Sequence, residues 1–130
     1  MEKLILVVED NLINQELLTD ILERVLVCRV ILASDGQEAV DMAVSNLPHL
    51  ILMDVGLPVM SGIEAMEKIK SHDKTRHIPI MALTGYSSPA DEQKMMKKGF
   101  DGFLPKPFDI PLLLEKIKGV LDIKQGVNPV

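Results

Sequence analysis

Hydrophobic residues follow two different spacings along the chain. Short runs that are almost continuously apolar occupy residues 4–8, 28–33, 50–53, 78–83 and 103–104. Runs of this length are typical of strands that are buried on both faces of a sheet. Each run is followed by a longer segment in which apolar residues recur three or four positions apart, which indicates one buried face of a helix.

The helical segments begin and end at residues with suitable local chemistry. Asn11 is a suitable N-cap for the first helix and Asp109 for the last. Ser88 followed by Pro89 predicts the start of the fourth helix, and Gly99 predicts its end. Strand and helix therefore alternate five times. This alternation predicts an α/β fold in which helices cover both faces of a parallel sheet.

Length and composition fit a single domain. The chain has 130 residues, of which 47% are hydrophobic, so it can bury a core and disorder is not expected. We predict one domain over residues 1–124 and a loose tail over residues 125–130, where no periodicity remains. The net charge of −5 argues against direct nucleic-acid binding, because such modules carry a basic face.

Three features predict a protein of the cytoplasm. No apolar stretch approaches the ~20 residues that a membrane-spanning helix requires, so no membrane association is expected. The first apolar run ends at Glu9, so it is too short to be a signal peptide. The lone cysteine, Cys28, cannot form an internal disulfide and lies in an apolar run. We therefore expect a buried structural thiol in a reducing compartment.

Polar residues stand where the predicted strands end. Glu9 and Asp10 follow the first strand, Asp54 follows the third, Thr84 follows the fourth and Lys106 comes soon after the fifth. In a parallel sheet these points share the carboxyl edge, where ligands of open α/β sheets bind. Three acids, one hydroxyl and one ammonium are therefore expected to meet there.

Each of these residues alone has a simpler interpretation. Asp10 or Asp54 would more often be a helix cap, Thr84 a turn residue and Lys106 a solvated charge. Convergence of three acids needs another reason, because like charges within a few ångströms raise one another's cost of ionisation. Such a cluster indicates a bound cation or a reaction. Oxygen ligands favour a hard ion, Mg²⁺ or Mn²⁺, over zinc.

Four motifs occur together and in order. They are VEDN at residues 8–11, MDVGLPVMSG at 53–62, ALTG at 82–85 and LPKPF at 104–108. With these motifs the chain resembles the CheY-like receiver domains of bacterial response regulators, over roughly residues 3–122. The resemblance implies a flavodoxin-like, doubly wound sheet of five parallel strands in the order 2-1-3-4-5, with five helices.

The resemblance also implies a role for each acid. Asp54 is the nucleophile that becomes an aspartyl phosphate. Asp10 and Asp54 ligate the metal with side-chain oxygens, and Gly56 ligates it with its backbone carbonyl. Glu9 helps to hold the ion, often through water. The chemistry agrees, because a carboxylate can attack a phosphoryl group and form an acyl phosphate.

The remaining implied roles concern the phosphorylated state. Thr84 donates a hydrogen bond to the phosphoryl group, and Lys106 pairs with it. Phe103 occupies an aromatic switch position, and the Lys106–Pro107 bond is expected to be cis. Phosphorylation is expected to draw Thr84 inward and let Phe103 turn in. The surface of the fourth helix, fifth strand and fifth helix would then change its affinity for partners.

Some positions depart from the commonest family pattern. Gly56, Leu57, Ser61 and Gly85 replace residues that are more frequent there, although none of them removes a catalytic group. The family's dephosphorylation rate depends on the residues two positions beyond the acceptor and two beyond the threonine. These are Gly56 and Tyr86 here, so the lifetime of the phosphorylated state stays open.

Three functions are weighed against one another. The first is a phosphorylation-controlled switch without enzymatic output, either as a stand-alone regulator or as the receiver of a hybrid histidine kinase. Its partners would be a histidine kinase or histidine phosphotransfer protein and a downstream effector. The second, an Asp-nucleophile phosphatase, needs another acid close behind Asp54, and Val55-Gly56 supplies none. The third, a docking module with a vestigial acid site, is disfavoured by the intact polar set.

Overall fold

The computed structural model describes residues 2–85 and 88–121. Its strands are β1 (Leu4–Val8), β2 (Arg29–Ala33), β3 (Leu50–Asp54), β4 (Ile80–Thr84) and β5 (Gly102–Pro105). Its helices are α1 (Leu12–Arg24), α2 (Gly36–Asn46), α3 (Gly62–Ser71), α4 (Pro89–Lys98) and α5 (Ile110–Leu121). The five-fold alternation predicted from the hydrophobic spacing is confirmed.

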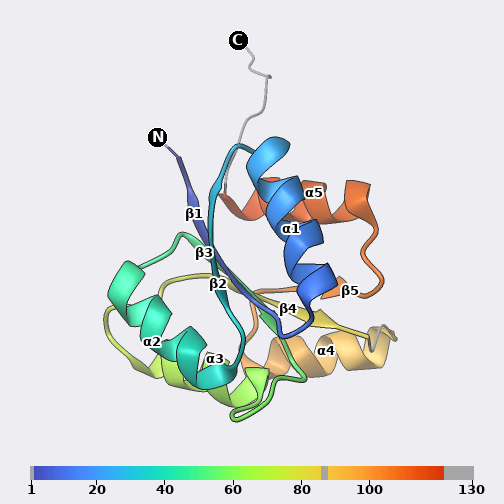
Figure 1. The fold of residues 1–130 in the computed structure, drawn as a ribbon. Coiled ribbons are helices and arrows are strands. Elements are labelled where there is room, and N and C mark those ends of the chain that lie inside the picture. The colour runs from blue at the N-terminus through green and yellow to red at the C-terminus, as the bar shows by residue number, and fades with distance from the viewer. Residues whose placement is uncertain (1, 86–87, 122–130) are drawn as a thin grey trace.

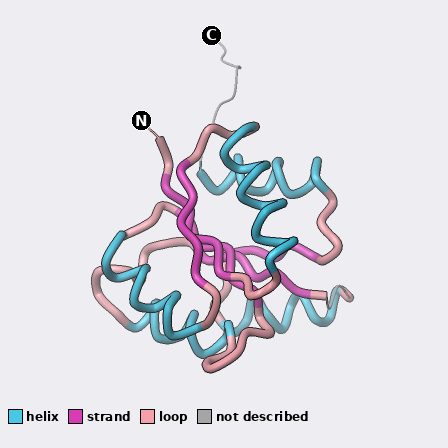
Figure 2. The backbone as a smooth tube through the Cα atoms, in the orientation of Figure 1, coloured by secondary structure: helices cyan, strands magenta, loops and turns pink. Residues whose placement is uncertain are grey.

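The strands form one parallel sheet in the order β2-β1-β3-β4-β5, as the family resemblance implies. Helices α1 and α5 cover one face, and α2, α3 and α4 cover the other (Figure 1). The smooth tube shows the strands gathered at the centre with helices on both sides (Figure 2). The fold is therefore a doubly wound α/β sheet, and the strand order places β1 and β3 side by side.

Alternate residues of each inner strand point into two separate cores. In β1, Ile5 and Val7 pack with α1 and α5, whereas Leu6 and Val8 pack with α2, α3 and α4. Every residue of β3 and β4 is buried, which explains why these strands are apolar up to their last residues, Asp54 and Thr84. Because both faces of the centre are sealed, polar chemistry is confined to the ends of the strands.

Most predicted boundaries are confirmed, and two strands begin later than expected. Asn11 and Ser88 cap α1 and α4 through side-chain oxygens, and Gly99 ends α4 with a φ of 125°. The Cys28 amide bonds to Leu22 at the end of α1, so β2 begins at Arg29. The Ile78 amide bonds to Thr75 in a turn, so β4 begins at Ile80 rather than at residue 78.

Two further expectations concern the ends of the chain and its relation to membranes. Residues 125–130, expected to form a loose tail, lie outside the described residues, as does Tyr86. Within the described part, none of the helices has the length and apolar character needed to cross a bilayer.

Candidate functional site

The carboxyl edge of the sheet brings the sequence-predicted acids together. Glu9 and Asp10 follow β1, and Asp54 is the last residue of the neighbouring strand β3. One carboxylate oxygen from each of the three lies within 4.8 Å of the others. Their exposure differs, because Glu9 and Asp54 are buried whereas Asp10 is exposed. The expected cluster is therefore present, with one acid facing solvent.

Glu9 is the most deeply buried acid of the cluster, with 1% of its surface exposed. Its Oε2 accepts from the Asn11 amide at 3.1 Å, and its Oε1 accepts from the Asn14 side chain at 3.4 Å. Burial raises the pKa of Glu9, and the charge of Asp54 adds to the rise, so together they outweigh the lowering by Lys106 and the Asn11 amide. Ionisation of Glu9 therefore costs free energy, and a nearby cation would reduce that cost.

Asp54 is fixed from two sides. Its Oδ1 accepts from the Gly56 amide at 3.0 Å, and its Oδ2 lies 3.1 Å from Lys106 Nζ. Thus one carboxylate oxygen is bound by the loop after β3 and the other by the loop after β5. The bonds to its two oxygens hold the carboxylate in one orientation.

Lys106 contacts two of the three acids. Its Nζ lies 3.0 Å from Glu9 Oε1 and 3.1 Å from Asp54 Oδ2. Burial acts to lower the pKa of Lys106, but its hydrogen bonds to Glu9 and Asp54 outweigh burial and raise the pKa. The Lys106 amide donates to the Thr84 carbonyl at 2.8 Å, and the Lys106–Pro107 bond is cis. The amide hydrogen bond holds Lys106 beside the end of β4, and its side chain reaches the acids at the ends of β1 and β3.

A divalent cation fits this donor set. Three carboxylates face a single ammonium among the described residues, so the cluster keeps an excess of negative charge. Oxygens on opposite sides of Mg²⁺ are about 4.2 Å apart. The three carboxylate oxygens lie within 4.8 Å of one another, which is close enough for one ion to contact all three. The donors are all oxygen, which suits a hard ion.

Gly56 lies in the loop after β3, and Gly62 is the first residue of α3. Steric contacts require a glycine at only one of these two positions. A Cβ added to Gly56 would meet nothing nearer than Asp54 Oδ1 at 4.0 Å, so packing does not require glycine there. A Cβ added to Gly62 would stand 2.1 Å from the Asp54 carbonyl oxygen. Gly62 therefore lets α3 begin directly against the end of β3, a role that the hydrophobic pattern did not indicate.

Thr84 and Phe103 lie on adjacent strands, as expected. Both are buried, with 3% of each residue exposed. The Phe103 ring already packs in the core between the sheet and α2, α3 and α4. In this structure the ring is therefore not exposed, and it has no inward turn left to make. Lys116 Nζ of α5 donates to the Phe103 carbonyl at 2.7 Å. The switch roles of Thr84 and Phe103 remain predictions.

Fold and site together define a doubly wound α/β domain of the receiver class. A family model described as the response regulator receiver domain matches residues 5–118. The chain belongs to this family, and it is a receiver domain of phosphorelay signalling. Domains of this family are regulatory rather than enzymes in the usual sense.

The chain is similar to proteins of known role. The polar-differentiation response regulator DivK of Brucella anthropi is 37% identical over 121 residues, which span 93% of this chain and 98% of that protein. The receiver domain of sensor histidine kinase PA1611 from Pseudomonas aeruginosa PAO1, solved with magnesium in the active site cleft, is 34% identical. The two structures superpose with a TM-score of 0.85, covering 94% of this chain and 99% of that domain.

A third similarity concerns a complex. The receiver domain of the Saccharomyces cerevisiae response regulator Ssk1 was solved together with the histidine phosphotransfer protein Ypd1. It is 34% identical to this chain, with a TM-score of 0.85 and coverage of 98% of this chain and 94% of that one. That receiver domain thus contacts a histidine phosphotransfer protein directly.

Proposed function

We propose that the chain is a phosphorylation-dependent switch that accepts a phosphoryl group on Asp54 from a histidine kinase or a histidine phosphotransfer protein. The observation that carries the proposal is the pairing of Asp54 with Lys106 inside a cluster of three carboxylates. A structural cap would not need a buried second acid and a lysine that arrives from the far end of the chain.

The residues present can support the transfer. A carboxylate oxygen of Asp54 forms the new O–P bond while the P–N bond to the donor histidine breaks, and the bonding electron pair returns to the imidazole. Lys106, which is 3.1 Å from Asp54 Oδ2, stabilises negative charge on the phosphoryl oxygens. Thr84 at the end of β4 donates its hydroxyl to the phosphoryl group. The acyl phosphate stays on Asp54 until water removes it.

Mg²⁺ or Mn²⁺ is the proposed cofactor. Glu9, Asp10 and Asp54 would hold it with carboxylates, and Gly56 with its backbone carbonyl. When bound, the ion neutralises charge on the acids and on the incoming phosphoryl group. Burial and the charge of Asp54 raise the pKa of Glu9, so a cation at this position would stabilise its ionised form.

The proposed effector surface is the face of α4, β5 and α5. An open groove of about 330 Å³ lies between β5 and α5, lined among others by Phe103, Lys116 and Val120. The bond from Lys116 to the Phe103 carbonyl connects α5 to the proposed switch strand. We propose that phosphorylation changes the affinity of this face for a downstream protein, without direct nucleic-acid or membrane contact, in the cytoplasm.

Acetyl phosphate tests the acceptor. With Mg²⁺, the intact mass should rise by one phosphoryl group, and the rise should be lost in Asp54→Asn or when EDTA is added. Asp41→Asn, which removes an exposed acid of α2, is the control and should label like wild type. Labelling of Asp54→Asn equal to wild type would refute the assignment. No labelling of a folded wild type would favour the docking module, and sustained turnover of phosphate monoesters would favour the phosphatase.

A further inference from the structure

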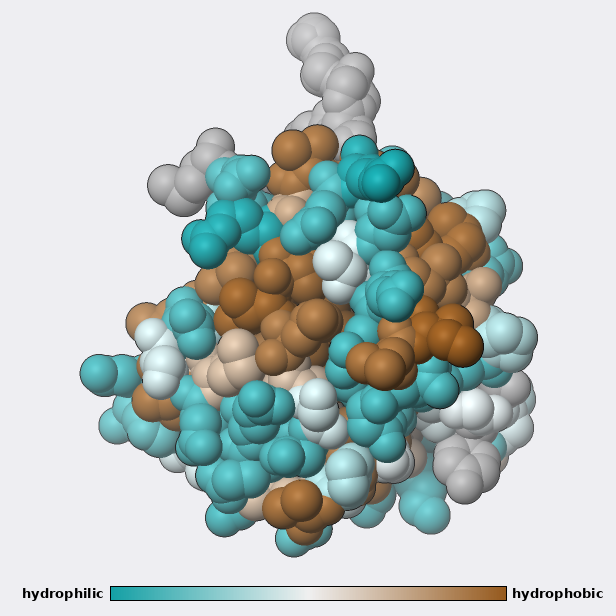
Figure 3. Space-filling view, in the orientation of Figure 1, coloured by the Kyte–Doolittle hydropathy of each residue, from teal (hydrophilic) through white to brown (hydrophobic). Residues whose placement is uncertain are grey.

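One edge strand of the sheet, β2, carries mainly apolar side chains, although edge strands ordinarily carry polar ones. β2 lies at one end of the sheet order and reads Arg-Val-Ile-Leu-Ala. Val30 and Ile31 are partly buried, and Leu32 is 39% exposed. Figure 3 views this face, with apolar residues at its centre, over β2 in Figure 1, and hydrophilic residues around them. Exposed apolar edges invite pairing with another strand, and proteins usually block them with charge.

The outward backbone groups of β2 belong to only two residues of the strand. The Arg29 amide donates to Lys3, and the Ala33 carbonyl accepts from Glu9, so odd-numbered residues pair with β1. Val30 and Leu32 therefore point their amides and carbonyls away from the sheet. Among the described residues nothing bonds to these groups. At residue 34 the outward amide is already taken by Glu38 Oε1 at 2.7 Å.

The edge of β2 can pair with the same edge of a second copy of the chain. A two-fold axis through Ile31 would place Val30 opposite Leu32 of a second copy, and Leu32 opposite its Val30. Each such pair exchanges two backbone hydrogen bonds in an antiparallel ladder. Leu17 and Leu32 also line an open groove of about 600 Å³ beside the edge, which the second copy would help to close.

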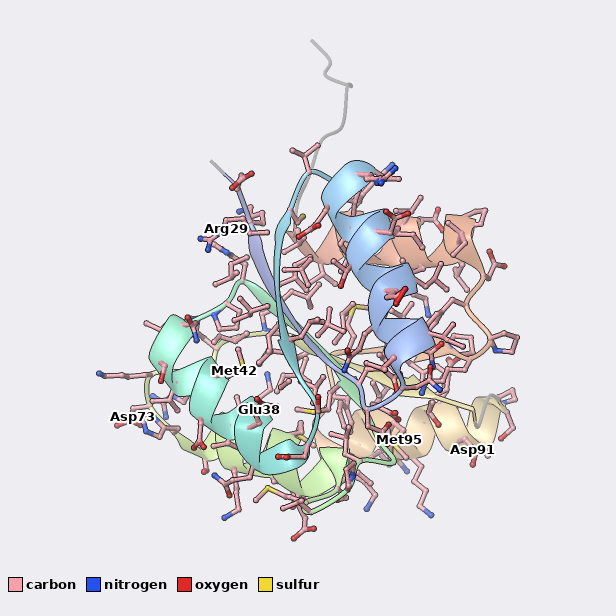
Figure 4. The ribbon with its side chains drawn as sticks, in the orientation of Figure 1. Arg29, Glu38, Met42, Asp73, Asp91 and Met95 are labelled. Atoms are coloured by element: carbon pink, nitrogen blue, oxygen red, sulfur yellow. The ribbon has the colours of Figure 1, made fainter. Side chains whose placement is uncertain are left out.

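The same two-fold axis would also bring opposite charges of the two copies together at the ends of β2. Arg29 begins β2 and forms no ion pair within the described part of the chain, while Glu38 is held just beyond the other end by its bond to Ser34. Figure 4 shows the two labelled residues at opposite ends of the strand. In the antiparallel pair, Arg29 stands opposite Ala33 of the other copy, next to its Glu38. Each Arg29 then faces an acid.

We propose that the β2 edge is the contact through which two copies of this chain associate, joining their sheets into one antiparallel-paired sheet. A partner of the same sequence fits because donors, acceptors, apolar residues and charges all match under one two-fold axis. Since the two β2 strands run in opposite directions, the two acid clusters face away from each other. Association therefore leaves both sites open.

Sedimentation and amide exchange on the whole chain test the proposal. The sedimentation coefficient should rise with protein concentration, and the Val30 and Leu32 amides should exchange more slowly as it rises. The Ile31 amide, already within the sheet, should change little. Leu32→Lys should abolish association, whereas Met96→Lys, a matched substitution on exposed α4, should not. Circular dichroism would confirm that both variants are folded.

Two charge reversals give a sharper result. Arg29→Glu and Glu38→Arg should each weaken association by about tenfold or more, because each homodimer then contains two like-charge pairs. An equal mixture should associate again, because the heterodimer contains only opposite-charge pairs. The proposal would be overturned if the chain stayed monomeric at every concentration and the Val30 and Leu32 amides stayed unprotected. The edge would then more readily suit an extended segment of another protein. The proposal would also be overturned by a dimer that Met96→Lys disrupts and Leu32→Lys does not.

Discussion

Lys106 supplies the positive charge that two buried carboxylates share. It lies within 3.1 Å of both Glu9 and Asp54, and its own side chain is only 23% exposed. Removing it would leave both acids without a counter-charge in a site that water reaches poorly. The consequences at this scale can be measured one residue at a time.

Lys106→Met should lower the free energy of unfolding in EDTA by about 1–3 kcal/mol, the usual cost of leaving buried polar groups unpaired. Mg²⁺ should recover part of this loss, because the ion can replace the missing charge. Urea unfolding in EDTA and in Mg²⁺ measures both effects. Lys94→Met, on α4, is the control and should change stability by no more than about 0.5 kcal/mol. Equal stability of Lys106→Met and wild type in EDTA would contradict the shared-charge interpretation.

Asp10→Asn should act in the opposite direction. Asp10 is the exposed member of the cluster, so its neutralisation removes repulsion without breaking the bonds of Lys106. We expect a gain of about 0.5–1 kcal/mol in EDTA and a weaker response to Mg²⁺. Asp54→Asn should gain less, because it also loses the ion pair with Lys106. Thermal unfolding of both variants, with and without Mg²⁺, gives the comparison, and a loss for Asp10→Asn would exclude a repelling cluster.

Cys28 gives a pH dependence with a definite sign. Burial raises the pKa of its thiol above the ordinary value of 9.0, and the charge of Glu2 contributes further. The folded chain then keeps a proton that the unfolded chain releases, so the free energy of unfolding falls as pH rises through 9.0. The raised pKa of Lys106 acts in the same direction only above 10.5. Urea unfolding between these pH values should show a fall in wild type that Cys28→Ala lacks.

At the scale of elements, the site depends on how closely α3 begins against β3. Gly62 is the first residue of α3, and its amide donates to the Val55 carbonyl at 3.0 Å. The close approach holds the loop that carries Gly56 over Asp54. The packing of one helix terminus thus helps to hold the Asp54 side chain in place.

Gly62→Ala should therefore be strongly destabilising, by about 2 kcal/mol or more, because its Cβ would overlap the Asp54 carbonyl. It should also slow labelling by acetyl phosphate. Gly119→Ala, in α5 where a Cβ meets nothing, should instead stabilise the chain by about 0.5–1 kcal/mol through helix propensity. Urea unfolding of both variants checks the contrast, and similar effects of the two substitutions would contradict it.

At the scale of the whole molecule, much of the architecture follows from hydrophobic spacing. Buried parallel strands must be apolar on both faces, so β1, β3 and β4 are visible as continuous runs. Because parallel strands share a carboxyl edge, the meeting of Glu9, Asp10 and Asp54 was also predictable. These conclusions need only the order of elements along the chain.

Other features depend on details that spacing cannot supply. That Glu9 is buried while its neighbour Asp10 is exposed depends on the direction in which the chain leaves β1. That Lys106 reaches both Glu9 and Asp54 depends on the strand order, which the resemblance rather than the spacing implied. The close packing of Gly62 requires coordinates, since a Cβ added to Gly56, the only glycine in the loop before it, would meet no atom nearer than 4.0 Å.

The contacts of Lys106 have a consequence for synthesis and folding. Glu9 and Lys106 are 97 residues apart in sequence, and Lys106 arrives only with the last strand. Contacts of such large separation form late, because the chain entropy of closing the loop must first be offset by other packing. A chain that ends before β5 contains Glu9, Asp10 and Asp54 but lacks the ammonium of Lys106 that pairs with two of them. If Asp54 accepts a phosphoryl group as proposed, chains that lack β5 and Lys106 should accept it poorly, so phosphorylation would be tied to completion of the domain.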